Sequence, residues 1–267
     1  MLSNLNAVMT KKNELKILLF VVFTITTNAC LKAQKSSLMN GTIIITLVSN
    51  DTIWLGADSR TTSLTEKGYT VNKDGMCKVY STNDIVYAMA GHVRYVDNSF
   101  NFLNLMRDCI YQQKDFEKSL FEFQERTKIK IGTILKKFSK KSIQTLVKTN
   151  KGSFLSVVAV SFANGEKKVK ELQFSIEPIN NKWNILSKSV DANDVGSLRF
   201  MGHATNALEF VKNNQLYFGN GRNIPDKIND LIKLESEKGT ITVGMPADVI
   251  SIYNNGFKRI ISSGLCQ

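Results

Sequence analysis

The residues that could carry chemistry lie in the first third of the chain. A Gly-Thr junction leads into a β-rich run at Thr42, and Asp58 follows sixteen residues later, with Lys73 and Lys78 beyond it. A threonine hydroxyl is a poor nucleophile until a base takes its proton. If the chain is cut just before Thr42, the new α-amine has a pKa of about 7.7–8.0 and can serve as that base. A nearby lysine ammonium would favour the neutral amine by like-charge repulsion.

Two runs extend this pattern in a fixed order. They are ADSRTT at 57–62 and CKVYSTNDIVYAMAGH at 77–92. Together with the Gly-Thr junction they resemble the proteasome β-subunit family of the N-terminal-nucleophile hydrolase superfamily, whose members are of the threonine peptidase type. The resemblance covers residues 41–92 well and extends more loosely to the end of the chain. It implies a threonine-type hydrolase that needs no metal and no organic cofactor.

The resemblance also implies a role for each residue of the pattern. Thr42 would be the nucleophile, Asp58 would hold a lysine in place, and the backbone N–H of Gly91 would bind the oxyanion. Lys73 lies nearer the family's distance from the aspartate, whereas Lys78 lies inside a predicted strand in the family's Lys-Val pair. A strand holds a residue more firmly than a loop, so Lys78 is our first choice and Lys73 the alternative.

The substrate would be a peptide or another small amide. By the same resemblance, Thr62 would offer its backbone to an extended peptide as an added strand. His92 would line the mouth of the site.

The second half of the chain departs from the family pattern. The family's Gly-Ser-Gly loop is replaced by residues 201–204, so His203 stands in the place of the serine as a candidate orienting group. The segment 242–248 has no Asp-x-x-Ser pattern. These departures predict a slow enzyme or, as the alternative, a catalytically silent proteasome-like scaffold or binding protein. The family likeness further implies assembly into a homo-oligomeric ring.

The first forty residues are typical of an export signal. Residues 11–16 are basic, residues 17–27 are apolar or threonine, and the small residue Ala33 marks a cleavage site. We therefore expect a signal peptide at 1–33, a short propeptide at 34–41 and a single hydrolase domain at 42–267, located in the periplasm or secreted. Cleavage at Gly41–Thr42 would activate the enzyme.

Two other interpretations of these first residues remain open. In one, a lipoprotein signal is cut before Cys30, which would anchor the chain to a membrane. In the other, the segment is a buried N-terminal strand or helix.

Composition narrows the remaining classes. The 267 residues are 43% apolar and 22% charged, which excludes a collagen and a wholly disordered chain. Two histidines and the absence of any CxxC pair argue against a zinc site, and no GxSxG elbow is present. The net charge is +12, but no basic patch interleaved with aromatic residues is present, so we expect no nucleic-acid partner. Cys77 and Cys109 are expected to pack as small hydrophobes. An oxidising compartment would also permit a disulfide between Cys109 and Cys266.

Hydrophobic periodicity predicts the elements. Strands are expected at 41–49, 52–57, 76–80, 84–90, 154–163, 169–176, 182–188, 198–201, 247–253 and 257–262. Helices are expected at 98–113, 116–147, 203–213 and 224–238, the second broken near Gly132. Paired strands and paired helices predict an α+β fold, a four-layer αββα sandwich with two antiparallel sheets packed face to face between helix pairs.

Overall fold

The computed structural model describes residues 42–64, 70–93, 100–179, 182–219, 221–238 and 243–263. All of them belong to one structural unit, Leu38–Gln267. The predicted signal peptide at 1–33 and the predicted propeptide at 34–41 lie outside the described residues, and so do Cys30 and Cys266.

The first sheet carries the start of the described chain. Its five antiparallel strands are, in spatial order, β10 (Leu198–Gly202), β1 (Ile43–Val48), β2 (Thr52–Ala57), β11 (Asp248–Tyr253) and β12 (Gly256–Ile261). The register places Ile44 opposite Ala57 and Ile43 opposite Gly202. The beginning of β1 therefore lies between the end of β2 and the end of β10.

The second sheet is also antiparallel throughout. Its strands are β5 (Val79–Thr82), β6 (Ile85–Gly91), β7 (Ser153–Ala163), β8 (Glu166–Ile179) and β9 (Lys182–Asp191). The β7–β8 turn has positive φ at both Asn164 and Gly165, as the tight turns that match strand twist require. A separate hairpin, β3 (Thr61–Leu64) and β4 (Thr70–Lys73), was not predicted, because its short polar strands give no hydrophobic alternation.

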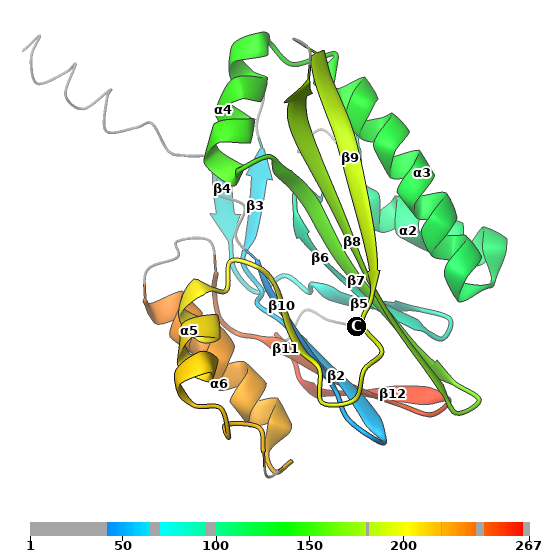
Figure 1. Ribbon diagram of the computed structural model, residues 1–267, viewed down its shortest axis with the longest axis vertical. Helices are drawn as coiled ribbons and strands as arrows, with labels where there is room; N and C mark the ends of the chain where they lie inside the picture. The colour runs from blue at the N-terminus through cyan, green and yellow to red at the C-terminus, as the bar shows by residue number, and fades with distance from the viewer. Residues whose placement is uncertain are drawn as a thin grey trace, which may run out of the picture. The chain divides into compact units, whose positions relative to one another are not determined.

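Helices cover the outer faces of both sheets (Figure 1). α2 (Phe102–Gln113), α3 (Phe116–Leu135) and α4 (Lys140–Asn150) pack on the second sheet, and α5 (Thr205–Asn213) and α6 (Ile224–Glu237) on the first. The predicted break in the helical region 116–147 is present, but it lies at 136–139 rather than at Gly132. The helix runs on to Leu135, and the next one begins after Ser139, whose side chain accepts the Ser142 N–H and caps the first turn.

Alternating side chains divide the core into three layers. In β6, Val86, Ala88 and Ala90 face the first sheet, whereas Tyr87 and Met89 face the helices. A third cluster lies between the first sheet and α5–α6. Each fully buried aliphatic side chain contributes about 1.5–3 kcal/mol, so these layers hold the sandwich together. The predicted four-layer α+β fold is confirmed.

Cys109 packs in the core as the expected small hydrophobe, whereas Cys77 differs from the expectation. Cys109 is a free thiol buried in α2, so the Cys109–Cys266 bridge is wrong, because its side chain faces the helix–sheet core. Cys77 does not pack as a free hydrophobe but is disulfide-bonded, and its partner lies outside the described residues. Among the described helices, none is long and apolar enough to cross a membrane.

Candidate active site

Strand pairing brings Thr42 and Asp58 together. Thr42 immediately precedes β1 and is 5% exposed, and Asp58 immediately follows β2 and is fully buried. The Asp58 N–H donates to the Ile43 carbonyl at 3.3 Å, continuing the β1–β2 ladder. A hairpin between the two strands thus explains how residues sixteen apart in sequence meet at one end of a sheet.

Asp58 accepts four hydrogen bonds. Lys78 Nζ at 3.0 Å and the Ile43 N–H at 3.1 Å reach its Oδ1. The N–H groups of Arg60 at 3.0 Å and Gly244 at 3.1 Å reach its Oδ2. A carboxylate with both oxygens occupied in this way is held in a single orientation.

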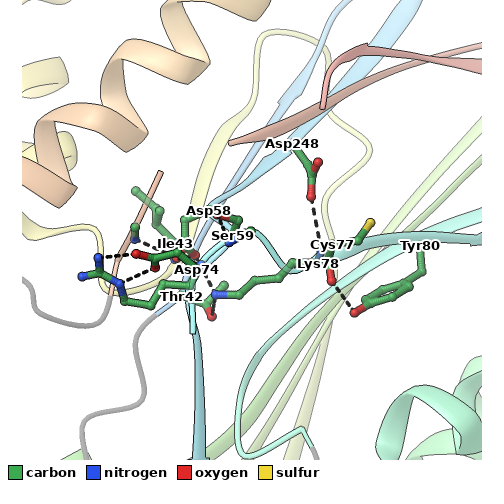
Figure 2. A network of polar contacts seen from close by, with 12 residues as sticks. Thr42, Ile43, Asp58, Ser59, Asp74, Cys77, Lys78, Tyr80 and Asp248 are labelled. Carbon is green, nitrogen blue, oxygen red and sulfur yellow. Dashed lines mark hydrogen bonds and ion pairs between the residues drawn. The ribbon is translucent and has the colours of Figure 1, made fainter. Parts of the chain in front are cut away.

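Lys78 bridges the other two side chains. It immediately precedes β5, is 5% exposed, and its Nζ contacts Thr42 Oγ1 at 2.6 Å as well as Asp58 Oδ1 (Figure 2). The alternative, Lys73, is the last residue of β4, and its side chain lies outside what the structure describes. The structure therefore brings together Thr42, Asp58 and Lys78.

Burial dominates the electrostatics of this pair. Burial lowers the pKa of Lys78, and the neighbouring Asp58 carboxylate opposes that shift. Burial likewise raises the pKa of Asp58, against the opposing effect of Lys78 and of the backbone N–H donors. Lys78 consequently holds its proton less firmly than a surface lysine does. Its Nζ donates a hydrogen bond to Thr42 Oγ1 at 2.6 Å.

A second buried carboxylate supports Lys78 through its backbone. Asp248 Oδ2 accepts the Lys78 N–H at 3.3 Å, and Oδ1 accepts the Ser263 N–H at 2.8 Å. Arg259 lies 3.4 Å from the same carboxylate and donates to the Val79 carbonyl at 3.0 Å. The sequence gives no signal for this role, because the family pattern assigns the side chains of 242–248 to orienting Thr42. Thr242 itself lies outside the described residues.

An ion pair fixes the loop before Lys78. Arg60 Nε and Nη2 contact the two Asp74 oxygens at 2.6 and 2.9 Å. Ser59 accepts the Gly75 N–H on its hydroxyl and the Met76 N–H on its carbonyl. These contacts join the turn after β2 to the segment that leads into Lys78, another connection with no signal in the sequence beyond the residue types.

Two glycines allow the backbone to approach closely. Gly91 ends β6 with φ +97°, and a Cβ there would lie 2.5 Å from the Phe154 carbonyl oxygen. Gly202 has φ +78°, and its Cβ would lie 1.8 Å from the Thr42 carbonyl oxygen. Only glycine fits either position, since both the dihedral and the space exclude a side chain. The oxyanion role of Gly91 stays a prediction.

The remaining predicted site residues take different places. His92, predicted at the mouth of the site, is instead buried against Phe154 with ring centroids 5.0 Å apart, and burial lowers its pKa to about 4. The backbone of Thr62 pairs with Asn72 in the β3–β4 hairpin. The His203 N–H donates to the Thr42 carbonyl at 2.9 Å, so this residue contacts Thr42 through its backbone.

A cavity of about 510 Å³ opens beside these groups. It is lined by Ala90, Gly91, Lys151, Ser153, Ser156, Gln173, Phe200, Met201, Gly202, His203 and Thr205. Two of the lining residues, Gly202 and His203, touch the Thr42 backbone, so the cavity lies next to the candidate nucleophile. Within the described residues, no three His, Cys, Asp or Glu side chains cluster as metal ligands would.

Comparison with known proteins identifies solved structures with a similar fold. No family model matches this sequence, and neither does any curated protein. A solved structure described as Anbu (ancestral beta-subunit) from Yersinia bercovieri is 10% identical and has a TM-score of 0.50, with 82% of this chain and 87% of that chain covered. A structure described as a helical assembly of the Anbu complex from Pseudomonas aeruginosa is 12% identical and has a TM-score of 0.51, covering 82% and 86%.

The chain shares its fold with these two Anbu structures. The sequence-based assignment to the proteasome β-subunit family is wrong, because no family model supports it and these two similar structures are Anbu proteins. At 10–12% sequence identity, the structural likeness shows a shared architecture and nothing finer. The physical reason is that a few polar residues at strand ends match a family motif, while the rest of the chain does not follow the family pattern.

Proposed function

We propose that this chain is a threonine-type N-terminal-nucleophile hydrolase that cleaves peptide or other small amide bonds after cleavage at Gly41–Thr42. The observation that carries the proposal is Lys78 Nζ, which lies 2.6 Å from Thr42 Oγ1 and 3.0 Å from Asp58 Oδ1 inside the protein. A buried lysine that contacts a threonine hydroxyl at the start of a strand is suited to activating that hydroxyl.

The reaction follows from these positions. The free α-amine of Thr42 takes the proton from Oγ1, and Oγ1 attacks the amide carbon. The oxyanion forms toward the Gly91 N–H. The protonated amine then gives its proton to the departing nitrogen, which leaves an ester on Thr42. Water hydrolyses that ester and restores the hydroxyl.

Lys78 and Asp58 tune this sequence of steps. A cation at Lys78 disfavours protonation of the neighbouring Thr42 amine, and Asp58 holds that cation in position. Asp248 acts indirectly, since it fixes the backbone N–H of Lys78.

Export is part of the proposal. The basic segment 11–16 and the short apolar segment 17–27 support a signal peptide, and the disulfide at Cys77 supports an oxidising compartment such as the periplasm. Attachment to a membrane would follow only from lipidation at Cys30. We also propose that copies of this chain associate, supported by the helical assembly described for the similar Pseudomonas protein.

One observation favours a catalytically silent scaffold as the second candidate. The described part of the C-terminal segment, 243–248, directs a backbone N–H toward Asp58 and a carboxylate toward the backbone of Lys78. Neither contact is a side-chain contact to Thr42. An amine held by fewer groups samples more orientations, which slows attack.

Mass spectrometry and active-site labelling separate the two candidates. Purified from its native compartment, the wild type should begin at Thr42 and react at that residue with a peptide electrophile that needs both a hydroxyl and a free α-amine. Thr42→Ala should abolish both processing and labelling, with little change in thermal stability.

Thr46→Val is the matched control. Thr46 is a buried threonine on the same strand, and its hydroxyl has no hydrogen-bond partner in the described part of the chain. The variant should therefore process and label as the wild type does. A wild-type chain that begins at Gln34 and never labels would instead support the scaffold, and processing that persists in Thr42→Ala would show that another protease makes the cut.

A further inference from the structure

The cavity beside Thr42 has two chemically different sides. On one side, the backbone of Gly202–His203 lies against Thr42, and Ala90 and Gly91 line the same cavity. The other side is polar and comes from the end of α4 and the strands after it, with Lys151, Ser153, Ser156 and Gln173. A substrate whose amide reaches Thr42 would place a neighbouring group against this polar side.

The lining of the cavity carries positive charge and no carboxylate. Lys151 contributes an ammonium, and none of the lining residues is a carboxylate. On β8, Glu171 precedes the lining residue Gln173 by two positions, but Arg199 Nε holds that carboxylate at 3.0 Å. The cavity therefore offers one cation and several neutral hydrogen-bonding groups to its occupant.

Backbone hydrogen bonds fix the position from which the Lys151 side chain extends. Lys151 is the C-cap of α4 in the left-handed conformation, with φ +50°, and its N–H donates to the Val147 carbonyl. The Gly152 N–H donates to the same carbonyl at 2.9 Å. These two bonds end the helix at the rim of the cavity and leave the exposed Lys151 side chain to meet a ligand.

The chain segment that contains Lys151 is also basic. Residues 126–165 contain nine lysines and arginines and no acidic residue. Six of them, from Lys136 to Lys151, form no ion pair within the part of the chain that the structure describes. A surface of one sign beside a site raises the rate at which oppositely charged ligands arrive.

We infer that this cavity binds a carboxylate of the substrate, so that the proposed hydrolase acts on peptides with an acidic group next to the scissile bond. The inference rests on the proposed function for the cleavage step but not for binding. Two sources supply the same chemistry, the side chain of a glutamate or aspartate and the free carboxylate at the end of a peptide.

Equilibrium binding tests the inference without relying on turnover. Three dansyl-labelled peptides are compared on the wild-type protein by fluorescence anisotropy, read before hydrolysis accumulates. One is an end-blocked peptide with a central glutamate, the second replaces that glutamate with glutamine, and the third is the glutamine peptide with a free C-terminal carboxylate. The glutamate peptide should bind at least about tenfold more tightly than its glutamine twin at low salt, and the preference should shrink as salt is added.

Variants test whether Lys151 causes the preference for the glutamate peptide. Lys151→Gln should reduce the preference for glutamate to less than about threefold, and Lys151→Glu should reverse it. Lys258→Gln, which removes an exposed lysine on β12 that is not part of the cavity lining, should leave it unchanged. Tighter binding of the third peptide than the first would assign the site to a terminal carboxylate.

Labelling of Thr42 by a neutral peptide electrophile is measured in parallel. Equal binding of the glutamate and glutamine peptides would overturn the inference, and labelling in that same protein would leave the proposed function standing. A glutamate preference without labelling would instead overturn the hydrolase and leave an acidic-peptide binding site.

Discussion

The two sides of the candidate site are built in different ways. On the side formed by β1, β2 and β5, three side chains meet directly, with Lys78 between Thr42 and Asp58. On the side formed by the C-terminal half, the contacts start from backbone N–H groups at His203 and Gly244. One side supplies reactive groups, and the other supplies hydrogen bonds that place them.

The difference teaches what a sequence can reveal. A side-chain function needs a particular residue type, so Thr42, Asp58 and Lys78 stand out by type and spacing. Nearly every residue carries a backbone N–H, so the sequence does not mark which ones point at Asp58 or Thr42. The departures from the family pattern at 201–204 and 242–248 are therefore compatible with a supported site, because backbone groups take part in that support.

Substitutions on the side of the site that supplies the side chains should have the largest effect on stability and on Thr42 labelling. Asp58→Asn leaves a buried ammonium without its charge partner, and Lys78→Met leaves a buried carboxylate with only backbone donors. Each should destabilise the protein by about 3–5 kcal/mol and lower Thr42 labelling by more than about a thousandfold. The double variant should regain part of the stability and none of the labelling, as urea unfolding and labelling rates would show.

A lysine elsewhere provides the control for that pair. Lys170 on β8 forms ion pairs with Glu117 and Asp191. Lys170→Met should cost less than about 1 kcal/mol, because these pairs are partly exposed, and should leave labelling unchanged. Near-normal labelling in Lys78→Met would contradict the assignment of Lys78 and direct the search to Lys73.

A substitution on the side of the site that supplies backbone hydrogen bonds should have a smaller effect on stability and on Thr42 labelling. Gly202→Ala would place a Cβ 1.8 Å from the Thr42 carbonyl oxygen, which must shift Thr42 or break the His203–Thr42 hydrogen bond. Gly196→Ala is the matched control, since Gly196 has a similar φ of +83° and open space around its Cβ position. Both should lose about 1–2 kcal/mol from the left-handed backbone alone.

Only Gly202→Ala should lower Thr42 labelling, by about tenfold or more. The comparison of the two alanine variants in one labelling assay isolates the clash from the conformational strain. Equal labelling in both would mean that the C-terminal side does not place Thr42.

The same distinction explains what the sequence predicts of the fold. Periodic strands such as 52–57 and the apolar helix faces predict the four layers, because their hydrophobic alternation is continuous. The β3–β4 hairpin escaped prediction because threonine, serine and asparagine dominate its strands. The helix break was placed at Gly132, where a glycine interrupts the pattern, yet the helix runs on to Leu135, since Ile131, Ile134 and Leu135 on either side of the glycine pack in the core.

Some site features had no pattern to find. Asp248 is a carboxylate at the start of a predicted strand, and its contact with the backbone of Lys78 spans 170 residues. Lys151 is one lysine among many in a basic stretch, and only the end of α4 brings it to the cavity. Such contacts depend on how the two sheets and their helices are placed, which local spacing does not encode.

His92 sharpens the comparison, because it is a titratable side chain that serves the core. Its imidazole packs on Phe154 and is 7% exposed, and burial lowers its pKa to about 4 from an ordinary value near 6.5. Between those two pKa values the unfolded chain binds a proton at this position and the folded chain does not. Acidification therefore favours the unfolded state, and the loss at pH 4 should reach about 3 kcal/mol from this residue alone.

The prediction is tested by urea unfolding of the wild type and His92→Gln at several pH values between 7 and 4. Carboxylates titrate over the same range, so the informative quantity is the difference between the two proteins, which should narrow by about 3 kcal/mol on acidification as the wild type loses its advantage. The pH dependence of Thr42 labelling, in contrast, should keep its shape in His92→Gln, because the imidazole packs on Phe154 in the core and the contacts of Lys78 Nζ go to Thr42 and Asp58. A labelling profile that shifts with His92→Gln would place this histidine in the site after all. A stability difference independent of pH would show that its imidazole is charged when folded.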